Sequence, residues 1–238
     1  MAALSILPIT GIGEIRPGDD LGGLIGDAAN ASESTRLRDG DCVVVTQKVV
    51  SKAEDMLVAV DPDDPLSHKP LVERESVRIL RRRGELIISE TRHGFVCANA
   101  GIDLSNVERG QAALLPEDSD RSARRIRDVL LGRFGVATGV IVSDTFGRTW
   151  RRGVTDVAIG CAGIAAIVDL RGTEDALGRE MQVTEVALVD EVAAAAELVM
   201  GKASGVPAAI VRGLDPGWFR PSSVRDEIVR APEDDLFR

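Results

Sequence analysis

Apolar residues along the chain form short continuous runs separated by stretches with helical spacing, which is typical of buried strands alternating with helices. Runs at 4–9, 42–45, 56–60, 86–89, 136–143 and 208–211 predict strands. The segment after Asp20 predicts a helix through Leu21, Leu24, Ile25 and Ala28. Residues 118–134 predict a second helix, because Ala123, Ile126, Leu130 and Phe134 fall on one stripe.

The secondary structure of three further segments is predicted from their polar and charged residues as well as from the apolar pattern. Residues 71–83 predict a basic helix whose arginines (Arg78, Arg81, Arg82 and Arg83) form a solvated face. Residues 91–106 are polar and contain glycine, which predicts a long ordered loop. Thr184 is the expected N-cap of a helix that carries Leu188, Val192, Ala195 and Val199, and Gly201 is its expected end.

Composition narrows the class of protein. The net charge of −9 over 238 residues argues against general nucleic-acid binding. No apolar run approaches the roughly 20 residues that span a bilayer, and the N-terminus lacks the basic segment of a secretory signal. The three cysteines (Cys42, Cys97 and Cys161) are far apart and odd in number, which disfavours disulfides and zinc sites. We therefore expect a cytoplasmic protein with reduced thiols and no membrane partner.

The segment 143–156 carries the clearest chemistry. The apolar residues 140–142 are followed by Ser143 and then by Asp144 and Thr145, whose hard oxygens suit Mg²⁺ or Mn²⁺ at the end of a strand. Arg148, Arg151 and Arg152 follow, with Trp150 among them, and offer anion binding beside an aromatic face. The segment predicts a site for a metal and an anion.

A second acid, Asp103, lies in the 91–106 region, in a stretch with glycine and asparagine. Asp103, Asp144 and the Thr145 hydroxyl could together hold a divalent metal against phosphate oxygens. In the alternative interpretation, Asp103 makes an Asx turn and Asp144 caps a turn. The spacing alone leaves both open.

No single motif gathers the groups that could bind an anion. The sequence contains neither GxxxxGK[ST] nor GxGxxG, which disfavours P-loop and Rossmann proteins. His93 could titrate near neutral pH or be structural, and Cys97 has no activating base nearby in the sequence. The candidate segments are Gly11-Ile12-Gly13-Glu14, Thr46-Gln47-Lys48 with Lys52, and Met200-Gly201-Lys202-Ala203-Ser204-Gly205-Val206-Pro207, the last of which could also be an ordinary helix end and turn.

Several longer sequence segments follow one another along the chain and together carry a family resemblance. They include Thr46-Gln-Lys-Val-Val-Ser-Lys-Ala-Glu54, Thr91-Arg-His-Gly-Phe-Val-Cys-Ala-Asn-Ala-Gly-Ile-Asp103, Ser143-Asp-Thr-Phe-Gly-Arg148, Trp150-Arg-Arg-Gly153 and Met200-Gly-Lys-Ala-Ser-Gly-Val-Pro207. Over residues 4–214 the chain closely resembles the coenzyme F420-0:L-glutamate ligase (F420:gamma-glutamyl ligase) family. The resemblance implies a two-lobed α+β fold with mixed sheets, unlike P-loop or Rossmann enzymes, and a homodimer.

The same resemblance implies an activity. It is the GTP-dependent, γ-linked addition of L-glutamate to coenzyme F420-0 or F420 through an acyl phosphate, with two Mg²⁺ or Mn²⁺ ions and K⁺ as a further candidate cation. Residues 1–214 would form the catalytic domain. Residues 215–238 would be an extension or linker toward a nitroreductase-like flavin domain, as in actinobacterial relatives.

Site roles also follow from the resemblance. Asp103 and Asp144 correspond to ligands of one metal, and Thr145 to a ligand of a second. Lys202 stands where many relatives have Gln, and it would serve the second metal through its backbone carbonyl or through its side chain. The expected GTP contacts are Asn106 and the three candidate segments 11–14, 46–48 with Lys52, and 200–207.

The chemistry of acyl-phosphate formation suggests roles for the arginines. We expect Arg148, Arg151 and Arg152 to act with Asp144 in catalysis, holding the acceptor's phosphate or carboxylates and the incoming glutamate. Trp150 would lie against the deazaflavin or be packed in the core. Two other functions stay open: a regulatory homologue that binds a nucleotide without turnover, and an amide ligase for another acceptor. The presence of Asp103 and Asp144 favours an enzyme.

Overall fold

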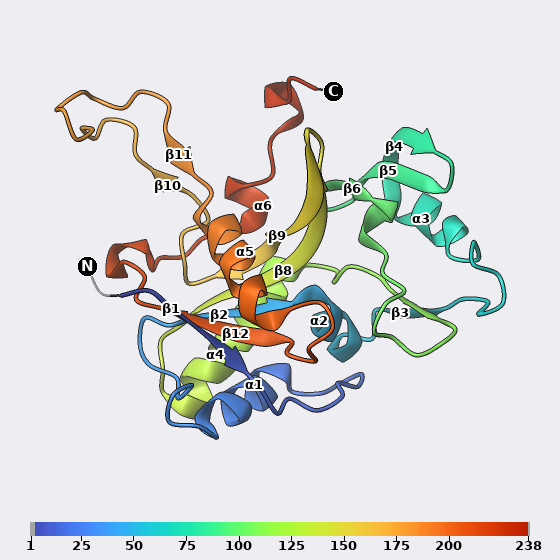
Figure 1. Ribbon diagram of the computed structural model, residues 1–238, viewed down its shortest axis with the longest axis horizontal. Coiled ribbons are helices and arrows are strands. Elements are labelled where there is room, and N and C mark those ends of the chain that lie inside the picture. Colours follow the sequence, from blue (N-terminus) through green and yellow to red (C-terminus); the bar gives the residue numbers. More distant parts are fainter. Residues whose placement is uncertain (1–2, 238) are drawn as a thin grey trace.

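The centre of the molecule is a five-stranded mixed sheet in the order β1-β12-β2-β8-β9 (Figure 1). The computed structural model describes residues 3–237. β2 and β8 are parallel, and the other neighbouring pairs are antiparallel. The strands are β1 (Ser5–Ile9), β2 (Cys42–Thr46), β8 (Gly139–Arg148), β9 (Arg151–Ala162) and β12 (Ala208–Arg212). The predicted α+β class is confirmed.

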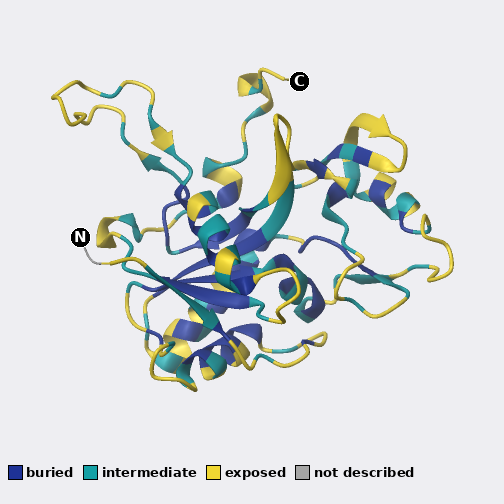
Figure 2. Ribbon diagram, viewed as in Figure 1, coloured by how far each residue is buried: buried dark blue, intermediate teal, exposed yellow. Residues whose placement is uncertain are grey.

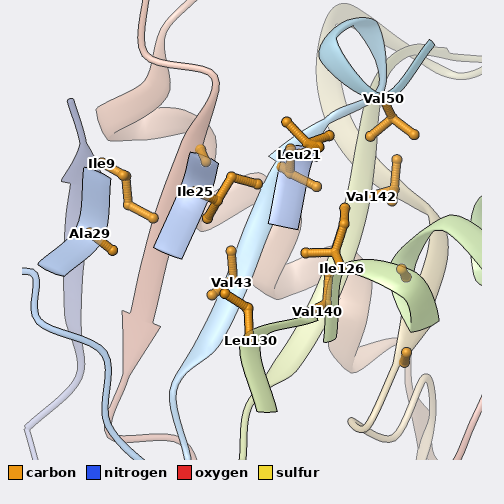
Figure 3. Close-up of a cluster of buried hydrophobic side chains, with 14 of the residues drawn as sticks. Ile9, Leu21, Ile25, Ala29, Val43, Val50, Ile126, Leu130, Val140 and Val142 are labelled. Atoms are coloured by element: carbon orange, nitrogen blue, oxygen red, sulfur yellow. The ribbon is translucent and has the colours of Figure 1, made fainter. Parts of the chain in front are cut away.

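Both faces of this sheet are buried under hydrophobic clusters, and successive side chains of a strand alternate between the two. On β2, Val43 and Val45 belong to one hydrophobic cluster, whereas Cys42 and Val44 belong to another. Figure 3 shows part of the first cluster, in which helix side chains pack against the strands. The first cluster contains side chains of α1 (Leu21–Asn30) and α4 (Ser119–Phe134), and the second contains those of α5 (Leu188–Met200).

Local signals in the sequence define the ends of the covering helices. Asp20 accepts a hydrogen bond from the Gly23 amide at 3.0 Å, and Asp118 accepts one from the Arg121 amide at 2.8 Å. Gly135 ends α4 in the left-handed conformation. The predicted helices around residues 21–28 and 118–134 are confirmed. The helix after residue 184 differs: it begins at Leu188, because the backbone at 184–186 pairs with the 168–170 segment instead.

A smaller lobe lies beside the central sheet (Figure 1). Its apolar cluster is built on Val72, Ile87 and Ala100. It contains α3 (Lys69–Glu75), β4 (Ser76–Arg83), β5 (Leu86–Thr91), β6 (Val96–Ala98) and the 3-10 turn Asn99–Gly101. The pair β3 (Leu57–Ala59) and β7 (Gln111–Ala113) joins this lobe to the rest of the chain.

The prediction of one basic helix over 71–83 was wrong in its second half. α3 ends at Glu75, and β4 then pairs with β5 as an antiparallel strand. Most of β4 is exposed to solvent, so its arginines extend into water from a strand rather than a helix. The expected loop at 91–106 is likewise shorter, because β6 and the 3-10 turn form within it.

The β8–β9 hairpin extends beyond the sheet and is exposed at its tip (Figure 2). We expected the strand to end at Asp144, but it continues to Arg148 because Asp144, Thr145 and Phe146 pair with β9. Residues 144–148 are therefore the outer part of a hairpin strand.

The remaining elements are α2 (Gln47–Ala53), which lies against β2 and β8, and short elements in the C-terminal part of the chain. Asp120 of α4 fixes this region: its carboxylate accepts hydrogen bonds from the amides of Cys161, Val224 and Arg225. Within residues 3–237, no helix has the length and apolar composition needed to cross a membrane. The short elements are β10 (Val168–Asp169), β11 (Glu185–Val186), α6 (Val224–Glu227) and the 3-10 turns Pro216–Trp218 and Pro232–Asp234.

Candidate functional site

The strand register brings most of the predicted site segments to one edge of the central sheet. Ile9 at the end of β1 pairs with Ala208 at the start of β12. Ala208 also pairs with Val45 of β2, and the next residue of β2, Thr46, lies opposite Ser143 of β8. Segments 11–14, 46–48 and 200–207 therefore meet beside Asp144 and Thr145, although they are distant in sequence.

Asp103 reaches this edge from the other lobe. Its backbone pairs with Ala113, with N···O distances of 3.0 and 2.8 Å, which fixes its position. Its carboxylate accepts the Ser105 amide at 2.6 Å and lies 2.9 Å from the Lys48 ammonium. Burial raises the pKa of Asp103, but the Ser105 amide and the Lys48 ammonium outweigh it, so the pKa lies below its ordinary value. The Asx turn expected in the alternative interpretation is present, and the second carboxylate oxygen faces Lys48.

Asp144 has the opposite electrostatic character. Burial raises its pKa to about 7, the Thr145 amide opposes this rise, and the charges of Asp103 and Asp156 add to it. Asp144 and Asp103 are thus close enough for each charge to destabilise the other. A divalent cation between them would relieve this repulsion.

Asp103 and Asp144 are a donor set compatible with a magnesium-like ion. In the described part of the chain, no group of three or more acidic, histidine or cysteine side chains could hold a metal. Mg²⁺ commonly takes only one or two carboxylates and completes its shell with water and substrate phosphates. Asp103 and Asp144 supply that number of carboxylates.

A second charged group surrounds Lys202, just beyond the end of α5. Its ammonium lies 2.6 Å from Asp156 and 3.1 Å from Glu197, and it donates a hydrogen bond to the Thr145 hydroxyl. Thr145 in turn donates to Asp156 at 2.7 Å, and Ser143 donates to the other oxygen of Asp156 at 3.2 Å. The Asp156 side chain is only 3% exposed, so these contacts compensate a buried charge.

Comparison with known proteins decides the family. The family model described as F420-0:Gamma-glutamyl ligase matches residues 11–213.

The chain belongs to this ligase family.

Curated relatives support the assignment along the full chain, and each is named coenzyme F420:L-glutamate ligase. The protein from Methanopyrus kandleri is 44% identical and covers 100% of this chain and 99% of its own length. The protein from Methanothermobacter thermautotrophicus is 42% identical, with 99% of each chain covered. The protein from Archaeoglobus fulgidus is 38% identical, covering 99% of this chain and 96% of its own.

Some positions expected to bind GTP in this F420 ligase family member already have hydrogen-bond or ion-pair partners within the chain. Gln47 is buried and donates to Ser51 at 2.6 Å and to the Leu114 carbonyl at 2.9 Å, so its side chain holds α2 against the neighbouring loop. Lys52 pairs with Glu14 at 2.5 Å, which links the 11–14 segment to α2. The amide of Thr46 donates to the Pro207 carbonyl at 2.9 Å.

Two other expected segments are exposed at the same edge. Gly11 has a φ of 84°, a backbone conformation that favours glycine in the turn after β1. Segment 200–207 includes the end of α5: the Gly201 amide donates to the Glu197 carbonyl at 2.9 Å, and Ser204 donates to the Met200 carbonyl. The helix-end interpretation of this segment is therefore confirmed. Asn106 is exposed, and the nucleotide role of all these residues stays a prediction.

The arginines of the hairpin are not brought to the acids within one chain. Arg148 lies four residues beyond Asp144 on an extended strand, roughly 13 Å away at about 3.3 Å per residue. Arg148 donates to the Arg152 carbonyl at 2.9 Å across the tip. Trp150 is 82% exposed, with its ring centroid 6.5 Å from that of Phe237, so of its two expected placements the packed one in the core was wrong.

Sequence reasoning missed Asp156 and Glu197. Asp156 is the partner of Thr145 in the β8–β9 register, and Glu197 lies one helical turn before Gly201. Recognising residues 151–162 as the returning strand of a hairpin would have placed Asp156 opposite Thr145. The expectations for His93 and Cys97 are consistent with the structure: His93 bonds to the Pro116 carbonyl at 3.0 Å, and burial raises the pKa of the Cys97 thiol to about 12.

Proposed function

We propose that this protein is a GTP-dependent ligase that attaches L-glutamate, through a γ-linked amide bond, to coenzyme F420-0 or F420. Membership of the F420-0:gamma-glutamyl ligase family and the names of its relatives support the substrates. The observation that carries the mechanism is the meeting of Asp103, Asp144 and Lys48 at one sheet edge, beside the segments 11–14 and 200–207.

The reaction divides into two balanced steps. A carboxylate of the coenzyme attacks the γ-phosphorus of GTP, the bond to the β-phosphate oxygen breaks, and an acyl phosphate and GDP form. The amine of glutamate then attacks the acyl carbon, inorganic phosphate leaves, and the amine releases a proton as the amide forms. Phosphoryl transfer needs mainly positioning and neutralisation of charge.

The residues of the site suit these needs. Asp103 and Asp144 would hold a Mg²⁺ or Mn²⁺ ion, which supplies positive charge to the phosphate oxygens. Lys48 faces the same carboxylate edge and can exchange part of its contact with Asp103 for a phosphate oxygen. The exposed turn at 11–14 offers backbone amides for close approach by a nucleotide.

The direct experiment incubates the full chain with GTP, Mg²⁺ or Mn²⁺, L-glutamate and the unglutamylated coenzyme. The expected result is GDP release that depends on both acceptors, with a mass increase of the coenzyme equal to one or more glutamate residues. Asp144→Asn should abolish both signals. Asp128→Asn, at an acid that is 74% exposed on α4, should leave them unchanged.

The same assay separates the two alternatives. A nucleotide-binding regulator would bind GTP without releasing GDP when both acceptors are present. A ligase for another acceptor would release GDP with a different acid and leave the mass of the coenzyme unchanged. The homodimer expected from the family is a separate proposal, tested by sedimentation equilibrium of the full chain.

A further inference from the structure

The ammonium of Lys202 is held as a bound cation would be held. It lies between the buried carboxylate of Asp156 at 2.6 Å, the carboxylate of Glu197 at 3.1 Å and the hydroxyl of Thr145. A lysine ammonium has three N–H donors and no acceptor. These three oxygens therefore use its full donor capacity, and its side chain cannot act as a metal ligand in this arrangement.

The hydrogen-bond directions agree with this view. The single proton of the Thr145 hydroxyl is donated to Asp156, so the lone pairs of Thr145 face the ammonium. Ser143 donates to the second Asp156 oxygen, which leaves the first oxygen for Thr145 and the cation. The oxygens around Lys202 are thus arranged as acceptors toward one positive centre.

The charge balance of the whole site points in the same direction. The site contains the carboxylates of Asp103, Asp144, Asp156 and Glu197 and the ammonium groups of Lys48 and Lys202. Without nucleotide, these four negative and two positive groups leave a charge of −2 when all are ionised, which one divalent cation neutralises. A second divalent cation beside Thr145 would have to displace the Lys202 ammonium.

We propose that the Lys202 ammonium takes the place of the second divalent metal, so that this chain uses one divalent ion at Asp103 and Asp144 together with a built-in cation at Thr145, Asp156 and Glu197. The role of that cation in the reaction rests on the proposed ligase function. The number of metal ions bound does not, because it can be measured without turnover.

The test counts Mn²⁺ ions bound per chain by electron paramagnetic resonance of the free ion. The full chain is titrated with Mn²⁺ alone and with Mn²⁺ plus a non-hydrolysable GTP analogue. Lys202→Gln should bind one more Mn²⁺ than the wild type under the same conditions, because the vacated oxygens can accept a metal. Lys202→Arg keeps the charge and should match the wild type. Lys69→Gln removes a lysine from the other lobe, where it bonds to Asn99 at 3.2 Å, and should also match.

Two results would overturn the proposal. One is a wild-type chain that binds two Mn²⁺ ions, a measurement that needs no variant to fold. The other is equal Mn²⁺ binding by the wild type and Lys202→Gln. This result overturns the proposal even if K⁺ alone raises the melting temperature of the variant. If the expected counts appear but the wild type makes no glutamylated coenzyme, the ligase function fails while the cation assignment stands.

Discussion

The raised pKa of Asp144 predicts that the metal-free protein loses stability as the pH rises, and that Asp144→Asn removes this loss. The folded-state pKa is about 7, whereas the ordinary value is 3.8. Because the folded state binds this proton more tightly than the unfolded state does, ionisation of Asp144 opposes folding. The penalty is absent well below pH 4, grows as the pH rises toward 7, and is constant above that.

The size of the effect follows from the shift. Each pH unit between the two pKa values changes the free energy of unfolding by about 1.4 kcal/mol. Between pH 5 and pH 8 the wild type should therefore lose about 2–3 kcal/mol relative to Asp144→Asn. Asparagine retains an oxygen that can accept the Thr145 amide bond, observed at 2.7 Å, so the comparison isolates the charge. Contributions from Asp103 and Lys48 are present in both proteins.

The assay is urea denaturation of both proteins at several pH values with a chelator present. The stability difference between them should widen from pH 5 to pH 7 and then stay level, and Asp128→Asn should follow the wild type at every pH. Addition of Mg²⁺ at pH 8 should stabilise the wild type and not Asp144→Asn. Parallel pH profiles for the wild type and Asp144→Asn would refute the reasoning, because they would mean that the carboxylate is not destabilised in the folded state.

Four further substitutions test other parts of the structure. Arg151→Ala should raise the KM for the coenzyme about tenfold, with little change in kcat, because one charge-assisted hydrogen bond is lost. An unchanged KM in steady-state assays would remove this residue from the substrate site. Asp120→Ala leaves three backbone amides without their acceptor and should cost about 3 kcal/mol in urea denaturation. Gly26→Ala should lower stability by about 1–3 kcal/mol in thermal melts, because a Cβ there would lie 2.2 Å from an aromatic ring of α4. Gly132→Ala has open space around the added Cβ and should raise stability by about 0.5–1 kcal/mol in the same assay.

Much of the central fold could be predicted from local pattern. The continuous apolar runs of β1, β2 and β12 and the amphipathic spacing of α4 each have one favourable structural solution. The sequence 71–83 does not, because its arginines are compatible with either a solvated helix or a solvated strand. There β4 forms because it pairs with β5, and that contact across the Gly84 turn is tertiary information.

The candidate site divides in the same way. Asp144 could be proposed as a site residue because an acid closely follows a buried apolar run, and Asp103 because the family resemblance pairs it with Asp144. The Lys202 group was not identifiable, because it requires the register of β8 with β9 and the position of the last turn of α5. Such a site depends on three segments whose spacing in sequence carries no periodic signal.

The position of the hairpin arginines restricts what they can do in catalysis. The backbone of Arg148 is roughly 13 Å along an extended strand from that of Asp144, and the Arg148 guanidinium bonds to the Arg152 carbonyl at the hairpin tip instead of extending toward the acid. A group at that distance that binds the acceptor contributes equally to the ground state and the transition state, which lowers KM without raising kcat. Under the proposed function, neutralisation of charge at the phosphate would then come from the sheet edge itself, where Lys48 lies 2.9 Å from Asp103 and Lys202 lies 2.6 Å from Asp156. The hairpin is therefore suited to substrate recognition, and the sheet edge to chemistry.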